Sequence, residues 1–184
     1  MSSLETFEST LKDVVNAKRL SASKMSSLTD IALSFMKNDT QLVSTLFRTH
    51  RTLPPAAKVN SLYVFDALSR AARNQINKHR LAPPSDPSQG NCATFIVKVE
   101  GILDSLWQDL LSTRDETLKE KSKKILDIWV KNNTFPSAAL ERLSQLLEKS
   151  EKGACRILYS LAKRSSRSCN SIICFPPTFT LSED

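Results

Sequence analysis

Apolar side chains recur every three or four residues through most of the chain, with polar side chains between them. In residues 3–17, for example, Leu4, Phe7 and Leu11 follow this spacing, which is typical of one buried helix face. The same pattern predicts seven helices, over residues 3–17, 21–38, 41–52, 56–78, 93–112, 114–131 and 136–149. The spacing therefore predicts an all-α fold of seven helices, or eight if another follows Gly153.

Turn-forming residues separate these predicted helices. The clearest loop is 81–91 (LAPPSDPSQGN), and Pro54-Pro55 suits the first turn of the helix that follows it. Hydroxyl groups near Ser21, and the Asn38-Asp39-Thr40 segment, are expected to cap the next helices. Residues 153–184 end without a consistent period, so we expect a domain over 1–152 and a C-terminal extension, with one short helix at most and then disorder.

Composition narrows the class of protein. The 184 residues are 40% hydrophobic and 24% charged, and no apolar run is long enough to span a membrane. The polar N-terminus does not resemble a signal peptide, so we expect an intracellular protein. The net charge of +7 suits an anionic partner but does not choose among phosphopeptide, nucleic acid and lipid headgroup.

Catalytic and metal-binding patterns are missing from the sequence. None of the motifs HExxH, GxSxG, GxxxxGK and GxGxxG occurs, which favours a binding module over an enzyme. No CxxC is present and the two histidines lie far from the cysteines, so we expect no metal, no cofactor and reduced thiols. His50 and His79 are expected on the surface, and Trp107, Trp129 and Cys92 in the interior.

The helix predicted over residues 56–78 has two distinct faces. Its apolar stripe is formed by Phe65, Leu68, Ala72 and Ile76. The other face carries Val59, Tyr63, Asp66, Arg70, Arg73 and Asn77. Taken alone, this face is expected to be solvated, with Asp66 and Arg70 as an ordinary ion pair one turn apart.

Two segments about 65 residues apart together point to a family. KVNSLYVFDALSR (58–70) and KKILDIWVKNNTFP (123–136) resemble the CID patterns LYxxDSIxR and LxxWxxxxxF. The CID is the domain that binds the C-terminal domain of RNA polymerase II. Residues 20–29 (LSASKMSSLT), and GNCATFIVKVEGIL after the loop, also resemble fungal termination factors of the Nrd and Seb type. The resemblance extends from about Leu4 to Lys149.

The resemblance implies a fold and a function. CIDs are right-handed superhelical bundles of about eight helices, similar to VHS and ENTH domains. They are non-catalytic readers of the phosphorylated polymerase heptad YSPTSPS, which forms a β-turn against the second and fourth helices and the helix carrying Trp129. The resemblance implies a nuclear monomer that couples transcription to RNA 3′-end processing and termination. Contacts with RNA or other processing factors are expected only through regions outside this domain, and none with membranes.

The resemblance also assigns the peptide-binding residues. Asp66 is expected to accept a hydrogen bond at the peptide turn, and Arg70 to hold Asp66 or reach the peptide. The remaining expected contacts are the aromatic Tyr63, the apolar Ile128 with Ile125 one turn earlier, and the basic Lys131. Where the family has the sequence DSI, this chain has Asp66-Ala67-Leu68, so a serine hydroxyl is lost.

Three further residues are expected to bind phosphate. Ser21 and Lys24 match the site for the phosphorylated fifth heptad residue, and a helix start with a hydroxyl and a cation suits an anion. Lys124 stands where readers of the phosphorylated second residue have arginine. Because lysine keeps the charge but not the bidentate geometry, we expect the second-residue phosphate to be accepted and the fifth to be read weakly.

Two other functions are compatible with the helical pattern. A VHS/ENTH-like adaptor of membrane traffic would need a basic lipid-binding first helix, whereas this one begins with Glu5 and Glu8. Direct RNA binding would suit the charge, but the sequence shows no exposed aromatic platform on which bases would stack.

Overall fold

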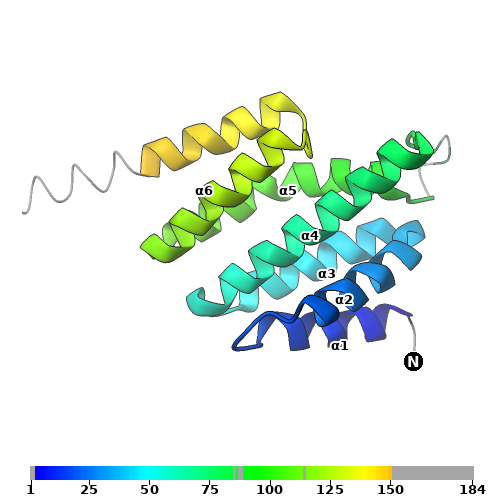
Figure 1. Cartoon of the computed structure of the whole chain (residues 1–184), viewed down its shortest axis with the longest axis horizontal. Helices are drawn as coiled ribbons and strands as arrows, with labels where there is room; N and C mark the ends of the chain where they lie inside the picture. The colour runs from blue at the N-terminus through cyan, green and yellow to red at the C-terminus, as the bar shows by residue number, and fades with distance from the viewer. Residues whose placement is uncertain (1–2, 85, 87–88, 114, 151–184) are drawn as a thin grey trace, which may run out of the picture. The chain divides into compact units, whose positions relative to one another are not determined.

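The computed structural model describes residues 3–84, 86, 89–113 and 115–150, and every regular element in them is helical (Figure 1). The elements are α1 (Ser3–Val15), α2 (Ala22–Ser34), η1 (Met36–Asn38), α3 (Asp39–Thr52), α4 (Pro55–His79), α5 (Cys92–Ser112), α6 (Glu116–Lys131) and a helix over residues 137–150. The predicted all-α fold is confirmed. None of the helices in these ranges is both long and apolar enough to cross a membrane.

The chain divides into two compact units, Met1–Glu148 and Lys149–Asp184, and the first is described below. The extension expected over 153–184, with its short helix and disorder, lies outside the described residues. The domain boundary expected at 152 stays a prediction.

The helix boundaries follow local capping chemistry. Asn91 and Thr94 form a capping box at the start of α5, and the Asp115 side chain accepts hydrogen bonds from the first turn of α6. Helix α4 begins with Pro55 and ends at His79, and the C-cap residue Arg80 adopts a left-handed conformation with φ 50°. The expected loop between α4 and α5 is confirmed for the residues of 81–91 that the structure describes.

The predicted second helix, 21–38, is interrupted. Helix α2 stops at Ser34, the Phe35 N–H donates to both Ile31 O and Ala32 O, and η1 leads directly into α3. Ser21 and Asn38 occupy the N-cap positions of α2 and α3, within the segments expected to cap these helices, but neither side chain makes a capping bond. Asp39 is instead 2% exposed and bonded to Lys98 Nζ, a residue of α5. A long-range ion pair thus holds the first residue of α3 against α5.

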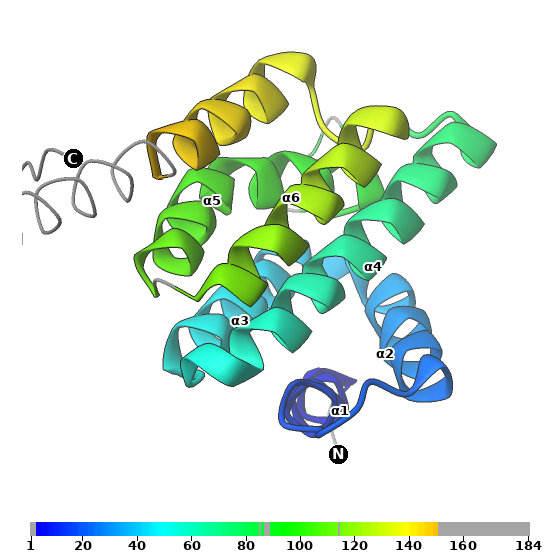
Figure 2. The same cartoon turned by 60° about the vertical axis from the view of Figure 1, so that its left-hand side comes forward.

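Helix α4 is central to the first unit, since it packs against α1, α2, α3, α5 and α6. In both views it runs between α2 and α6 (Figures 1 and 2). Trp107 and Trp129 are fully buried, as expected, with ring centroids 5.5 Å apart, and Phe135 lies 4.9 Å from Trp129. Cys92 is also buried, as expected. These tilted and edge-to-face contacts join α5 to α6 and to the segment that follows α6.

A polar cluster lies inside the fold where α3, α4 and α5 meet. The expectation that His50 lies on the surface was wrong, because its side chain is 0% exposed, whereas His79 is exposed as predicted. His50 Nδ1 lies 3.1 Å from Ser61 Oγ, and Nε2 lies 3.1 Å from Asp109 Oδ2. Lys58 Nζ donates to the same Asp109 oxygen. Burial lowers the pKa of His50 to about 4, so the imidazole is neutral at pH 7.

Gly90 is a position where a side chain has no room. A Cβ there would lie 2.5 Å from Asp39 Oδ1 and 2.7 Å from Met36 O. We therefore expect Gly90→Ala to lower the free energy of unfolding by about 1–3 kcal/mol, because the loop must move away from η1. Urea denaturation measures the change.

Gly101 is the matched control, because a Cβ at this exposed position in α5 meets nothing within 4 Å. Gly101→Ala should stabilise the helix by about 0.5–1 kcal/mol. Equal effects of the two substitutions would contradict the close approach at Gly90.

Candidate functional site

A buried carboxylate connects α4 to α6. Asp66 is 4% exposed, so the predicted solvated face is wrong at this position. Its Oδ1 accepts from Arg70 Nε at 2.8 Å and Trp129 Nε1 at 2.9 Å, and its Oδ2 accepts from Arg70 Nη2 at 2.6 Å. The predicted contact between Arg70 and Asp66 is present, and this hydrogen bonding raises the pKa of Arg70. A carboxylate offers about four acceptor positions, so Oδ2 keeps one for a further donor.

Tyr63 lies one turn before Asp66 on α4. Its ring is half-buried against the core, and Lys121 Nζ from α6 lies 6.0 Å from the ring centroid. This distance is at the limit for a cation–π contact. Lys121 was not among the expected site residues, although it lies two turns before Ile128 and therefore on the same helix face.

Helix α6 exposes only some of the side chains that were expected to contact the peptide. Ile128 is 39% exposed and Lys124 and Lys131 are exposed, so these three side chains are accessible. Ile125 is 2% exposed and packs in the core, so the expectation that it contacts the peptide beside Ile128 was wrong. The helical turn between Ile125 and Ile128 rotates Ile125 toward the interior. Val130, 51% exposed, is apolar surface that the sequence reading did not single out.

Helix α2, whose start carries the predicted phosphate residues, lies on the opposite side of α4 from α6 (Figure 2). Lys24 is exposed in the first turn of α2, and Ser21 occupies the N-cap position. The Ser21 hydroxyl lies 2.8 Å from the Ser23 hydroxyl and does not bond a first-turn N–H. The helix start is therefore left available for an anion.

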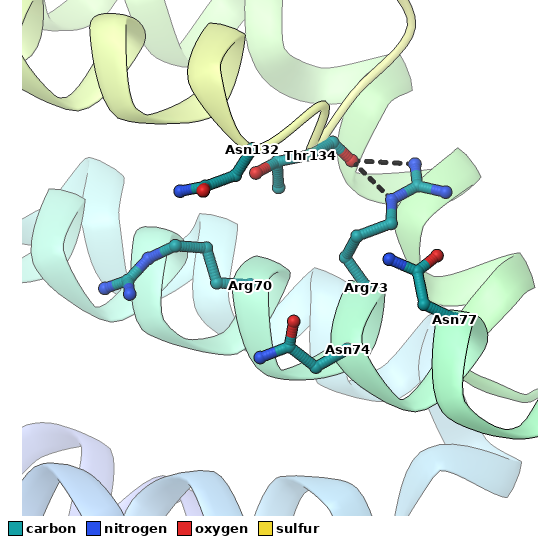
Figure 3. A pocket seen from close by; sticks show the side chains of 6 residues that line it. All are labelled: Arg70, Arg73, Asn74, Asn77, Asn132 and Thr134. Atoms are coloured by element: carbon teal, nitrogen blue, oxygen red, sulfur yellow. Dashed lines mark hydrogen bonds between the residues drawn. The ribbon is translucent and has the colours of Figure 1, made fainter.

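A polar cavity of about 370 Å³ continues beyond Asp66 between α4 and the segment after α6 (Figure 3). It is lined by Arg70, Arg73, Asn74, Asn77, Asn132 and Thr134. The sequence placed Arg73 and Asn77 on the Asp66 face but gave no sign of Asn132 or Thr134, which arrive from another element. Within the described ranges, no group of three or more His, Cys, Asp or Glu is arranged to hold a metal ion.

Comparisons with known proteins give a consistent set of relatives. The sequence model of the CID domain matches residues 5–143. The Rpb7-binding protein seb1 of Schizosaccharomyces pombe is 25% identical over 171 residues, which are 92% of this chain and 27% of that protein. This chain therefore spans about a quarter of the length of that relative.

Two solved structures are similar to this chain in both sequence and fold. The CTD-interacting domain (CID) of Seb1 from S. pombe is 26% identical with a TM-score of 0.72, covering 81% of this chain and 98% of that one. Yeast Nrd1 CID in complex with Sen1 NIM3 is 25% identical with a TM-score of 0.69, covering 77% and 96%.

Proposed function

Because the chain belongs to the CID domain family and is related to the fungal Nrd and Seb factors, we propose that it binds the C-terminal domain of RNA polymerase II. It would be a non-catalytic module that reads phosphorylated YSPTSPS repeats in the nucleus, as a monomer, and couples transcription to RNA 3′-end processing and termination. One observation carries the proposal: Arg70 and Trp129 fix Asp66 one turn after Tyr63 on α4. The sequence resemblance assigns the same aspartate to the peptide turn.

The fixed carboxylate explains how a peptide turn would be recognised. Arg70 and Trp129 hold Asp66 in one orientation, which limits the entropy lost when a peptide binds. The free acceptor position on Oδ2 would take an N–H or O–H of the turn. The Arg70 side chain is 44% exposed and lies over this carboxylate, so it can move aside or contact the peptide itself. Tyr63 and Ile128 would pack against the apolar heptad side chains.

Cations on both flanks would read phosphate. Lys124 on α6 would accept the second-residue phosphate as a point charge, and Lys24 with Ser21 on α2 would read the fifth weakly. Each of these sites is open to solvent, so each should add only a modest gain in affinity. Contacts with RNA or other processing factors would come through regions outside this domain.

Titration with labelled two-repeat heptad peptides tests this function. We expect dissociation constants on the order of micromolar or weaker, with the second-residue phosphopeptide binding tightest. Lys124→Gln should weaken that phosphopeptide by about threefold to tenfold, because one charge-assisted contact is lost. The control Lys12→Gln removes the same charge from an exposed site on α1 and should change nothing. Binding that ignores phosphorylation altogether would contradict the proposal.

A further inference from the structure

The cavity beyond Asp66 shares one residue with the proposed peptide site. Arg70 both pairs with Asp66 and lines the cavity, which continues along α4 through Arg73 to Asn77. Figure 3 shows Asn132 and Thr134 facing this stretch of α4 from across the cavity. Its volume of about 370 Å³ lies within the range typical of sites for small ligands, about 300–1,000 Å³. A chain bound over Asp66 would therefore meet this cavity next.

Arg73 gives the cavity a positive charge that no carboxylate of the described residues neutralises. Arg73 donates from Nε at 2.9 Å and Nη2 at 2.7 Å, both to the carbonyl oxygen of Thr134. No salt bridge to Arg73 occurs in the part of the chain that the structure describes, and no acidic residue is among those lining the cavity. The remaining guanidinium N–H groups are available to an acceptor.

Uncharged donors surround this arginine. Among the described residues, none hydrogen-bonds the side-chain amides of Asn74, Asn77 or Asn132. The Thr134 hydroxyl is an independent sign of a missing partner, since Thr134 is 0% exposed and this oxygen is buried without a hydrogen bond. A buried polar group without a partner costs free energy, so a polar ligand or water that completed it would be stabilised there.

The C-terminus of α6 lies near the cavity, and the negative end of its helix dipole would repel an anion if its carbonyl groups were unpaired. The carbonyl oxygens of Ile128, Trp129 and Val130 already accept hydrogen bonds from the N–H groups of residues 132, 134 and 133. The Thr134 carbonyl is occupied by Arg73. The negative ends of these peptide dipoles are thus paired within the protein.

We propose that this cavity is an anion subsite for an acidic or phosphorylated residue that flanks the peptide segment bound at Asp66. The inference rests on the proposed function, because the peptide must first lie over Asp66. Arg73 supplies the charge, Arg70 connects the two sites, and the asparagine amides donate to the remaining oxygens. A phosphoryl group and a carboxylate share the acceptor oxygens that this lining selects.

Substituting Asn74 and Asn77 tests the subsite without disturbing the arginines. Both side chains are exposed on α4, so Asn74→Asp/Asn77→Asp introduces repulsive charge with little change in shape. Peptides would carry serine, phosphoserine or glutamate at one flanking position at a time. For at least one position, wild type should bind the anionic peptide about fivefold more tightly than the neutral one. The ratio should fall to about one in the double variant and persist in Asn74→Gln/Asn77→Gln.

The outcomes separate this inference from the function on which it rests. If wild type binds no heptad peptide, the proposed function fails and the subsite fails with it. If peptides bind but the anionic preference is equal in both double variants, only the subsite is overturned. Comparing the phosphoserine peptides with the glutamate peptides shows whether the subsite prefers a phosphorylated residue or an acidic one. A single-stranded RNA oligonucleotide is the last comparison. If it binds more tightly than any peptide, and if this binding is lost in Asn74→Asp/Asn77→Asp, the cavity binds nucleic acid and the inference is overturned.

Discussion

Asp66→Ala is expected to abolish measurable heptad-peptide binding and to lower the free energy of unfolding by about 2–4 kcal/mol. The substitution removes the acceptor of three hydrogen bonds from Arg70 and Trp129. Trp129 is 0% exposed, so its indole N–H would be left buried without a partner. Peptide anisotropy measures the first effect, and denaturant unfolding followed by tryptophan fluorescence measures the second.

Two variants separate the loss of folding from the loss of recognition. Asp66→Asn keeps an oxygen for the Trp129 N–H but loses the charge that pairs with Arg70, so its stability should be intermediate and its binding still weak. Asp127→Ala removes an exposed carboxylate from α6, next to Ile128, and should leave stability nearly unchanged. Folded Asp66→Ala that binds peptide as tightly as wild type would overturn the role of this carboxylate.

The helices could be predicted because their signals are local. Apolar spacing and turn residues placed α1, α4, α5 and α6 within a few residues of their observed ends. No glycine or proline near Phe35 indicates that the predicted helix breaks there. The break depends on the burial of Met36 and on the pairing of Asp39 with Lys98, which is 59 residues away in sequence. A contact between residues so far apart in sequence produces no local pattern of apolar and polar positions.

In the candidate site, too, the features that could be predicted depend on local spacing and the others depend on tertiary packing. Tyr63, Asp66 and Arg70 lie at successive turns of one helix, so spacing alone could put them on one face. Ile125 could not be separated from Ile128 in this way, because both are apolar positions one turn apart on α6 and the packing of the fold decides which of them is covered. The cavity beyond them needs Thr134, which is placed by the left-handed Asn133 at φ 48°.

His50 was misplaced for a related reason. An imidazole near a helix end has no local signal of burial, and its partners Ser61 and Asp109 belong to α4 and α5. Lys58 would likewise be read as a surface residue, yet it is 8% exposed. The ion pair of Lys58 with Asp109 compensates for the cost of burying the ammonium group. The burial of each of these polar side chains therefore depends on the presence of the others.

Asp109→Ala is accordingly expected to lower the free energy of unfolding by about 2–4 kcal/mol, since it leaves the buried Lys58 charge unpaired. The value lies below that of a fully buried pair because the Asp109 side chain is 30% exposed. The matched control is Asp104→Ala on the same helix, whose partner Arg142 is 48% exposed, and it should cost less than about 1 kcal/mol. Urea unfolding compares the two variants.

A second substitution identifies the cause of that loss. If the unpaired ammonium group is responsible, Lys58→Met in the Asp109→Ala background should recover stability, because methionine keeps most of the side-chain volume without the charge. If Lys58→Met instead adds its own loss to that of Asp109→Ala, the two residues are not coupled and the buried pair does not stabilise the meeting point of α3, α4 and α5. Because the cluster shares no residue with the proposed peptide site, folded variants of either kind should bind heptad peptide as wild type does.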